Sequence, residues 1–100
     1  MKITVNARNG ELTDAVIETI ETKVAKLPRF FDRTTAIQVM VDLQHDEPKM
    51  EIILSAEGAS DFFGSDTGAN VIAALDTTIA KMETQLRKHK EKITEHRDRQ

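Results

Sequence analysis

The segment IQVMVDLQHDEPKMEIILSAE, residues 37–57, decides the fold, because it contains two runs that each alternate apolar and polar side chains. Alternation with period two is typical of a strand with one buried face. In the first run the inward positions are Ile37, Val39, Val41 and Leu43. The turn His45–Pro48 follows, and the second run, residues 49–57, places inward Met50, Ile52, Leu54 and Ala56. The segment therefore predicts an antiparallel hairpin.

Upstream of the hairpin, the sequence predicts a strand and a helix. Residues 2–7 alternate and run into the turn residues Arg8, Asn9 and Gly10. Thr13 is a suitable N-cap, and the apolar residues behind it recur at steps of three and four: Val16, Ile17, Ile20, Val24 and Leu27. This pattern predicts an amphipathic helix of about four turns that extends through Lys26. Pro28 should end it, because proline lacks an amide donor and disfavours helical geometry in the preceding residue.

Downstream of the hairpin, the sequence predicts a short strand and one long helix. The strand is expected around Phe62-Phe63 and Gly64. Asn70 is a good N-cap, and the apolar positions after it step by three and four: Ile72, Leu75, Ile79, Met82, Leu86, His89 and Ile93. At 1.5 Å per residue this helix would run about 35–40 Å, roughly twice the length of a typical strand. We expect its last turns to project beyond the sheet, with a frayed tail after about residue 93.

The order strand, helix, strand, strand, strand, helix predicts an α+β fold, β-α-β-β-β-α. A right-handed crossover places the first strand parallel to the second, and the other neighbouring strands pair antiparallel. Two parallel helices should cover one face of this four-stranded mixed sheet, an arrangement like that of a double-stranded-RNA-binding domain, and leave the other face in water. With 100 residues the chain has room for a single domain, residues 1–100.

Composition excludes several classes of protein. The chain has 39% hydrophobic and 31% charged residues, as in a soluble globular domain, and its lack of cysteine excludes disulfides and zinc–thiolate sites. Its apolar runs are too short to span a bilayer, so we expect a cytoplasmic protein without a membrane partner. The net charge of −3 disfavours a general nucleic-acid coat, but the charge is uneven. Residues 1–80 have 7 basic and 13 acidic side chains, whereas residues 81–100 have 7 basic and 4 acidic ones.

Enzyme activity has little support in the sequence. The chain has no nucleophile-elbow, phosphate-loop or dinucleotide glycine motif, and no HExxH or calcium-loop spacing. His89 and His96 are seven residues apart on one helix, about 10 Å along its axis, which is too far to share a metal ion without other ligands. We therefore expect no catalysis, no cofactor, no metal and no small-molecule substrate.

The basic residues of both predicted helices gather on one flank. Lys23 and Lys26 lie opposite the acidic flank of the first helix, and Arg29 and Arg33 follow just after Pro28. The second helix also has two flanks of different charge. Its basic flank contains Lys81, Gln85, Lys88, Lys92 and Arg99, and its acidic flank contains Asp76, Glu83, Glu91, Glu95 and Asp98. Solvated faces with intrahelical ion pairs are the usual explanation of such charges. Pairing along a helix would mix the signs on each flank, so the segregation favours binding to the phosphates of structured RNA. Stacking of single-stranded bases is not expected, because Tyr and Trp are absent and the four Phe are expected in the core.

Several motifs, in this order, resemble those of the ribosome hibernation-promoting factors, also called ribosome-associated inhibitors or sigma-modulation proteins. They are RNGELTDA (8–15), KVAKL (23–27), RFFDR (29–33), AALD (73–76), KME (81–83) and QLRKHK (85–90). The resemblance implies the same fold and binding to ribosomal RNA in the decoding region of the small ribosomal subunit, where the domain would block the messenger and transfer RNA sites. Carried over by position, the implied RNA contacts are Lys23, Lys26, Arg29, Lys81, Arg87, Lys88 and Lys90. The helical wheel agrees for Lys23, Lys26, Lys81 and Lys88, but it places Arg87 and Lys90 near the acidic flank or the core edge.

Longer members of this family add a carboxyl-terminal dimerisation domain, so the chain resembles either a short member or the amino-terminal domain of a long one. We expect it to be monomeric when it is not bound to a ribosome. An alternative is a protein-interaction module that uses the open sheet face. On that face Met40 and Ile53 lie beside acidic residues, although isolated exposed apolar side chains are common.

Overall fold

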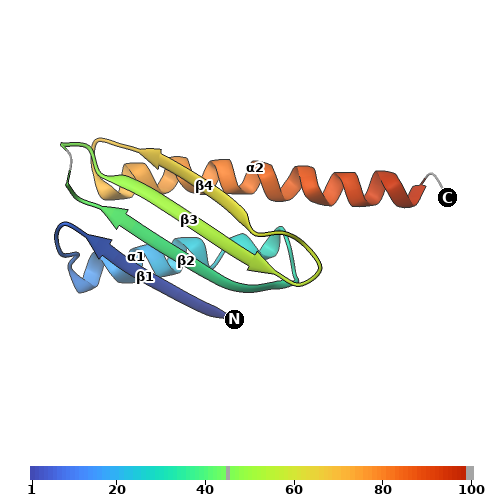
Figure 1. Ribbon diagram of the computed structural model, residues 1–100, viewed down its shortest axis with the longest axis horizontal. Helices are drawn as coiled ribbons and strands as arrows, with labels where there is room; N and C mark the ends of the chain where they lie inside the picture. Colours follow the sequence, from blue (N-terminus) through green and yellow to red (C-terminus); the bar gives the residue numbers. More distant parts are fainter. Residues whose placement is uncertain (45, 99–100) are drawn as a thin grey trace.

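The computed structural model describes the backbone of residues 1–98 and the side chains of residues 1–90, in both cases without His45. The elements follow the predicted order: β1 (Lys2–Arg8), α1 (Asp14–Val24), a 3-10 helix η1 (Leu27–Arg29), β2 (Thr34–Asp42), β3 (Lys49–Ala56), β4 (Phe62–Thr67) and α2 (Val71–Asp98). Figure 1 shows α1 and α2 running in the same direction on one side of the sheet. The predicted α+β class is confirmed, whereas the likeness to a double-stranded-RNA-binding domain stays a prediction.

The sheet has the predicted mixed topology, with the strand order β1-β2-β3-β4. β1 pairs parallel with β2, and the other two pairs are antiparallel. Across the outer face the register aligns Thr4, Gln38, Ile53 and Phe63 in one row. Since side chains alternate between the two faces, this register fixes which residues reach the helices and which face water.

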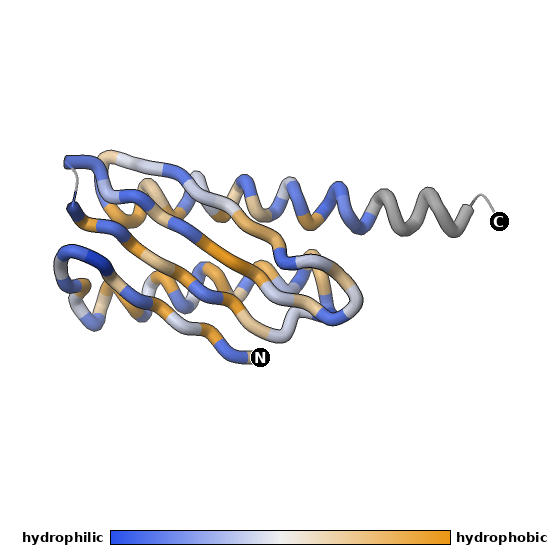
Figure 2. The backbone as a smooth tube through the Cα atoms, viewed as in Figure 1, coloured by the Kyte–Doolittle hydropathy of each residue, from blue (hydrophilic) through white to orange (hydrophobic). Residues whose placement is uncertain are grey.

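The core lies between the sheet and the two helices. Figure 2 shows apolar and polar residues alternating along β2 and β3. The predicted inward residues of these strands are fully buried except for Leu43 and Ala56, which are partly buried. Gly64 is the inward residue of β4 where Met82 packs, and a Cβ built there would lie 2.7 Å from the Met82 sulfur. The lack of a Cβ at Gly64 therefore leaves room for the Met82 side chain and lets α2 approach the sheet closely.

Both predicted N-caps are confirmed. The Thr13 hydroxyl accepts a hydrogen bond from the Val16 amide at 3.2 Å, and the Asn70 side-chain oxygen accepts one from the Ala73 amide at 2.9 Å. These bonds satisfy amides that the first helical turn leaves without an intrahelical partner.

The predicted end of the first helix is wrong by two residues. α1 has 11 residues, about three turns, and ends at Val24 with Ala25 as its C-cap. Leu27 is buried, but it belongs to η1, which also contains Pro28, and not to a fourth turn of α1. Pro28 cannot donate the bond that a longer helix needs, but its missing amide is tolerated in the first turn of a new 3-10 helix.

The projection of α2 beyond the sheet is confirmed (Figure 1). At the point where α2 leaves the sheet, the His89 ring packs 5.4 Å from the Phe31 ring and 5.2 Å from the Phe62 ring. His89 continues the apolar spacing of α2, and its side chain is partly buried beside the Phe31 and Phe62 rings. The predictions for the side chains of Lys92, Ile93, His96 and Arg99 and for His45 lie outside the described residues. The frayed tail after about residue 93 stays a prediction.

Candidate nucleic-acid interface

Two segments that are distant in the sequence bring basic side chains to one end of the molecule, where α2 leaves the sheet. The Arg87 guanidinium lies 5.4 Å from the centre of the Phe30 ring, and His89 packs against Phe31. These contacts fix the last described turn of α2 against the chain that follows α1. We call the exposed residues there the basic end: Lys26, Arg29, Arg33, Arg87, Lys88 and Lys90.

Backbone hydrogen bonds after α1 place Arg29 and Arg33 on the surface. In η1 the Phe30 amide donates to the Leu27 carbonyl at 2.9 Å. The Thr34 hydroxyl donates to the Phe31 carbonyl at 2.6 Å and closes the turn into β2. Leu27 and the two Phe rings pack toward the core, so the charged residues between them face water.

Most of the basic end has no neutralising partner. The side chains of Lys26, Arg29, Arg33 and Lys88 form no ion pair with any residue that the structure describes. Arg87 is paired with Glu83 on its own helix, at 3.7 Å. Exposed carboxylates also lie at this end, on Asp32, Glu57 and Asp61, so its charge excess is moderate.

Lys23 was expected on an unpaired basic flank, and that expectation is wrong. Its ammonium lies 2.7 Å from the Asp76 carboxylate, in a bridge between α1 and α2. The basic flank of α1 therefore faces the acidic flank of α2. A helical wheel shows which charges share a flank of one helix, but it does not show which residues of two helices will meet.

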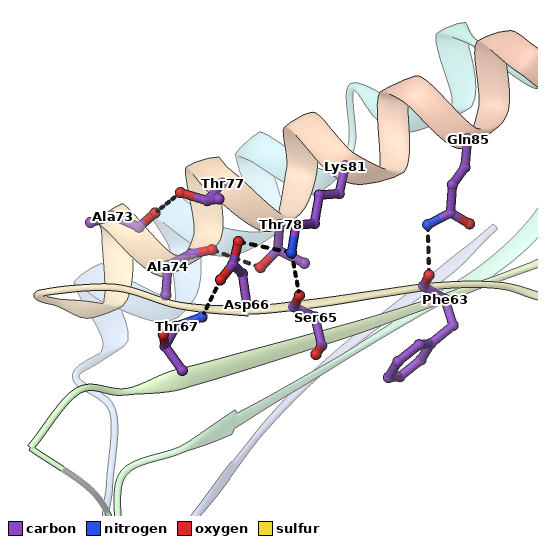
Figure 3. Close-up of polar contacts among 10 residues, drawn as sticks. All are labelled: Phe63, Ser65, Asp66, Thr67, Ala73, Ala74, Thr77, Thr78, Lys81 and Gln85. Atoms are coloured by element: carbon purple, nitrogen blue, oxygen red, sulfur yellow. Dashed lines mark hydrogen bonds and ion pairs between the residues drawn. The ribbon is translucent and has the colours of Figure 1, made fainter.

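Lys81 also has a carboxylate partner, on the opposite side of α2. Its ammonium lies 3.0 Å from Asp66 of β4 and donates to the Ser65 carbonyl at 3.2 Å (Figure 3). The hydrogen bond from Lys81 lowers the pKa of Asp66 below its ordinary value of 3.8, and the hydrogen bond from the Thr67 amide lowers it further. Gln85 donates to the Phe63 carbonyl at 2.7 Å. The flank of α2 predicted to be basic thus follows the edge strand β4.

The other end of the molecule is acidic. The turns at β1–α1 and β2–β3 meet there, since Arg8, Asp42 and Lys49 are register neighbours. Around them lie the carboxylates of Glu11, Asp14, Asp42, Asp46 and Glu47. Charge is therefore separated along the sheet from one end to the other, in addition to the separation across each helix.

Phe63 is a surface residue that the sequence argument missed. Phe30, Phe31 and Phe62 pack against the core as expected, but Phe63 is 53% exposed. Neighbouring residues of a strand face opposite sides, so Phe62 and Phe63 could not both be buried under the helices. That signal was present in the sequence. Of the other apolar residues expected on the open face, Met40 and Ile53 are partly buried.

The described part of the chain contains no group of three or more His, Asp or Glu side chains arranged to hold a metal ion. Among the same residues, no helix combines the length and the apolar character that crossing a membrane requires.

Comparison with known proteins identifies the family. Residues 3–94 match the sequence pattern of the family described as "Sigma 54 modulation protein / S30EA ribosomal protein". The ribosome hibernation promoting factor of Azotobacter vinelandii is 32% identical over 100 residues, which cover all of this chain and 92% of the relative. The protein of the same name from Escherichia coli K12 is 31% identical over 96% of this chain and the whole of the relative.

A solved structure has the same fold. The N-terminal domain of Thermus thermophilus Protein Y superimposes with a TM-score of 0.78 and 28% sequence identity, over 89% of this chain and 99% of that one. Both the sequence match and the shared architecture extend over nearly the whole chain, as the order of its motifs indicated. The chain belongs to the sigma 54 modulation protein / S30EA ribosomal protein family.

Proposed function

We propose that this protein binds the small ribosomal subunit and keeps idle ribosomes from translating. Its basic end would contact ribosomal RNA phosphates in the decoding region and block the messenger and transfer RNA sites. The observation that carries the proposal is the convergence of exposed cations from the chain around η1 and from α2 at one end of an anionic protein. Among them, Lys26, Arg29, Arg33 and Lys88 form no ion pair with any described residue. The names of the relatives, ribosome hibernation promoting factors, support a ribosome as the partner.

The separation of charge explains how a protein of net charge −3 can bind a polyanion. β3 runs from the acidic end to the basic end and has 8 residues, which span about 25 Å at about 3.3 Å per residue. Salt at physiological concentration screens charges beyond about 8 Å. A phosphate at the basic end is therefore attracted locally, while the distant carboxylates are screened. The same asymmetry orients the molecule as it approaches RNA.

The basic residues should contribute unequally. Lys26, Arg29, Arg33 and Lys88 can contact phosphate without losing an ion-pair partner among the described residues. Lys23 and Lys81 would first have to leave Asp76 and Asp66, so their net contribution is smaller. Arg87 shares its charge with Glu83. Lys90 is exposed at the same end, and Lys92, whose side chain lies outside the described residues, remains a proposed contact.

The proposed role requires no catalysis, cofactor or small-molecule substrate, which agrees with the non-enzymatic character of the family. We propose that the protein acts in the cytoplasm, where its partner is, and that it is a monomer when unbound.

Co-sedimentation with purified small subunits over a salt series tests the proposal. Each phosphate contact contributes about one unit to the slope of log affinity against log salt. Lys88→Ala should weaken binding and reduce this slope by about one unit. Lys49→Ala is the matched control, because it removes the same charge from the acidic end and should leave the slope unchanged.

Two results would count against the proposal. One is the absence of co-sedimentation at low salt, and the other is an equal loss of slope in both variants. Binding that persists when messenger and transfer RNA already occupy the subunit would exclude the decoding region as the site.

A further inference from the structure

Phe63 exposes an aromatic ring on the outer face of the edge strand β4. In Figure 3 the ring lies on the opposite side of the strand from α2. Its side chain is 53% exposed, and its neighbour in the register is Ile53 on β3. One exposed apolar side chain is common, but an aromatic ring is also a flat surface on which another molecule can stack.

The ring is attached to a well-held segment of backbone. Phe63 pairs with Ile53 in the β3–β4 ladder, and its carbonyl accepts the 2.7 Å hydrogen bond from Gln85. Because α2 fixes the strand at this residue, a ligand that stacks on the ring has little backbone to order. Such preorganisation lowers the entropic cost of binding.

Cations of α2 lie along the same edge. Lys81 is four residues before Gln85 and Lys88 is three residues after it, so all three lie on the flank that follows β4. The Lys81 side chain is 52% exposed, and Lys88 is exposed. Two carboxylates along this edge are paired, Asp66 with Lys81 and Glu51 with Lys49, whereas Asp61 is exposed just before β4. A phosphate at this edge would meet Lys81 and Lys88, and two of the carboxylates nearby are already paired.

We propose that Phe63 is a stacking platform for an unpaired RNA base, with the adjoining phosphates of that strand bound at Lys88 and Lys81. This inference rests on the proposed function and adds a single-stranded contact to it. The π-face of the ring accepts any base, and stacking of this kind is tolerant of sequence. A stable protein interface buries about 1,200–2,000 Å², much more than a single ring and the partly buried Ile53 and Met40 offer.

The chain has no Trp and no Tyr, so Phe63→Trp creates its one indole fluorophore. Stacking should quench that fluorescence when unstructured oligoadenylate is added, whereas inorganic polyphosphate, which has no bases, should not. Thr4→Trp is the matched control at the other edge of the same row and should respond to neither.

Binding to small subunits is the second measurement. Phe63→Ala and Phe63→Leu should each bind about 5- to 150-fold more weakly than the wild type, while Phe63→Trp keeps full affinity. Since the side chain is largely exposed, these variants should fold normally, and their thermal unfolding checks this.

Three results separate the possible failures. If Phe63→Ala binds subunits as the wild type does while Lys88→Ala binds more weakly, the stacking site is refuted and the proposed function stands. If Phe63→Leu keeps full affinity and oligoadenylate does not quench Phe63→Trp, the ring contacts protein, and the proposal is overturned. If the wild type does not bind subunits, the proposed function fails, and oligoadenylate quenching alone decides whether the ring stacks.

Discussion

Gly64→Ala should destabilise the domain through a single contact. A Cβ at this position would lie 2.7 Å from the Met82 sulfur and 3.1 Å from its Cγ, whereas carbon atoms at optimal contact are about 3.5–4.0 Å apart. Either α2 or the Met82 side chain must therefore move by about 1 Å. Met82 is fully buried, so it has no solvent to move into. Overpacking of this kind costs about 1–3 kcal/mol.

Thermal and urea unfolding measure this cost. In a domain of this size each kcal/mol lowers Tm by about 4–8 °C. Ser65→Ala is the control, because it changes the adjacent residue on the open face and should alter Tm little. The Met82→Ala background should remove most of the cost of Gly64→Ala, since the clashing atoms are then absent. Two results would contradict a close contact between Gly64 and Met82. One is an unchanged Tm for Gly64→Ala, and the other is an equal loss of stability in the wild-type and Met82→Ala backgrounds.

Two further predictions concern the ion pairs. Lys81→Ala should raise the pKa of Asp66, measured by NMR titration of its carboxyl group, because the hydrogen bond and positive charge of Lys81 hold that pKa low. Since the pKa of Asp66 in the folded state lies below 3.8, its carboxylate stabilises the fold above pH 3.8, and this contribution is lost as the pH falls through the folded-state pKa. Asp66→Asn should therefore flatten the dependence of unfolding free energy on pH in this range. An unchanged dependence would contradict the stabilising role of the Asp66–Lys81 pair. Lys23→Ala should weaken subunit binding less than Lys26→Ala does, because Lys23 is held by Asp76 and Lys26 has no ion-pair partner among the described residues. Equal losses in sedimentation would show that the Lys23–Asp76 bridge opens on binding.

Local patterns were sufficient to predict the elements of the fold. Burial alternates along β2 and β3 as the spacing of Val39 and Ile52 indicated, and side-chain caps begin both helices. The end of α1 was misplaced because the apolar spacing that reaches Leu27 suits an α-helix and a 3-10 helix equally well. A residue buried by either kind of helix gives the same apolar spacing in the sequence.

The candidate site was less predictable, because its chemistry depends on contacts between elements. Helical wheels placed Lys23 and Lys81 on basic flanks, but only the packing of three elements shows that Asp76 and Asp66 neutralise them. Arg29 and Lys88 reach the same end of the molecule because the chain turns through η1. From the sequence, Pro28 was predicted only to end the first helix. By contrast, the exposure of Phe63 could have been derived from its neighbour Phe62 by alternation alone.

The side chains of Lys81 and Gln85 occupy the Ser65 and Phe63 carbonyls, which point outward from β4. An unpaired strand edge is a template on which another chain can add. A strand from another chain would have to displace both side chains before it could pair with β4, so the edge strand resists the addition of a further strand. Copies of the protein are therefore hindered from pairing edge to edge along β4.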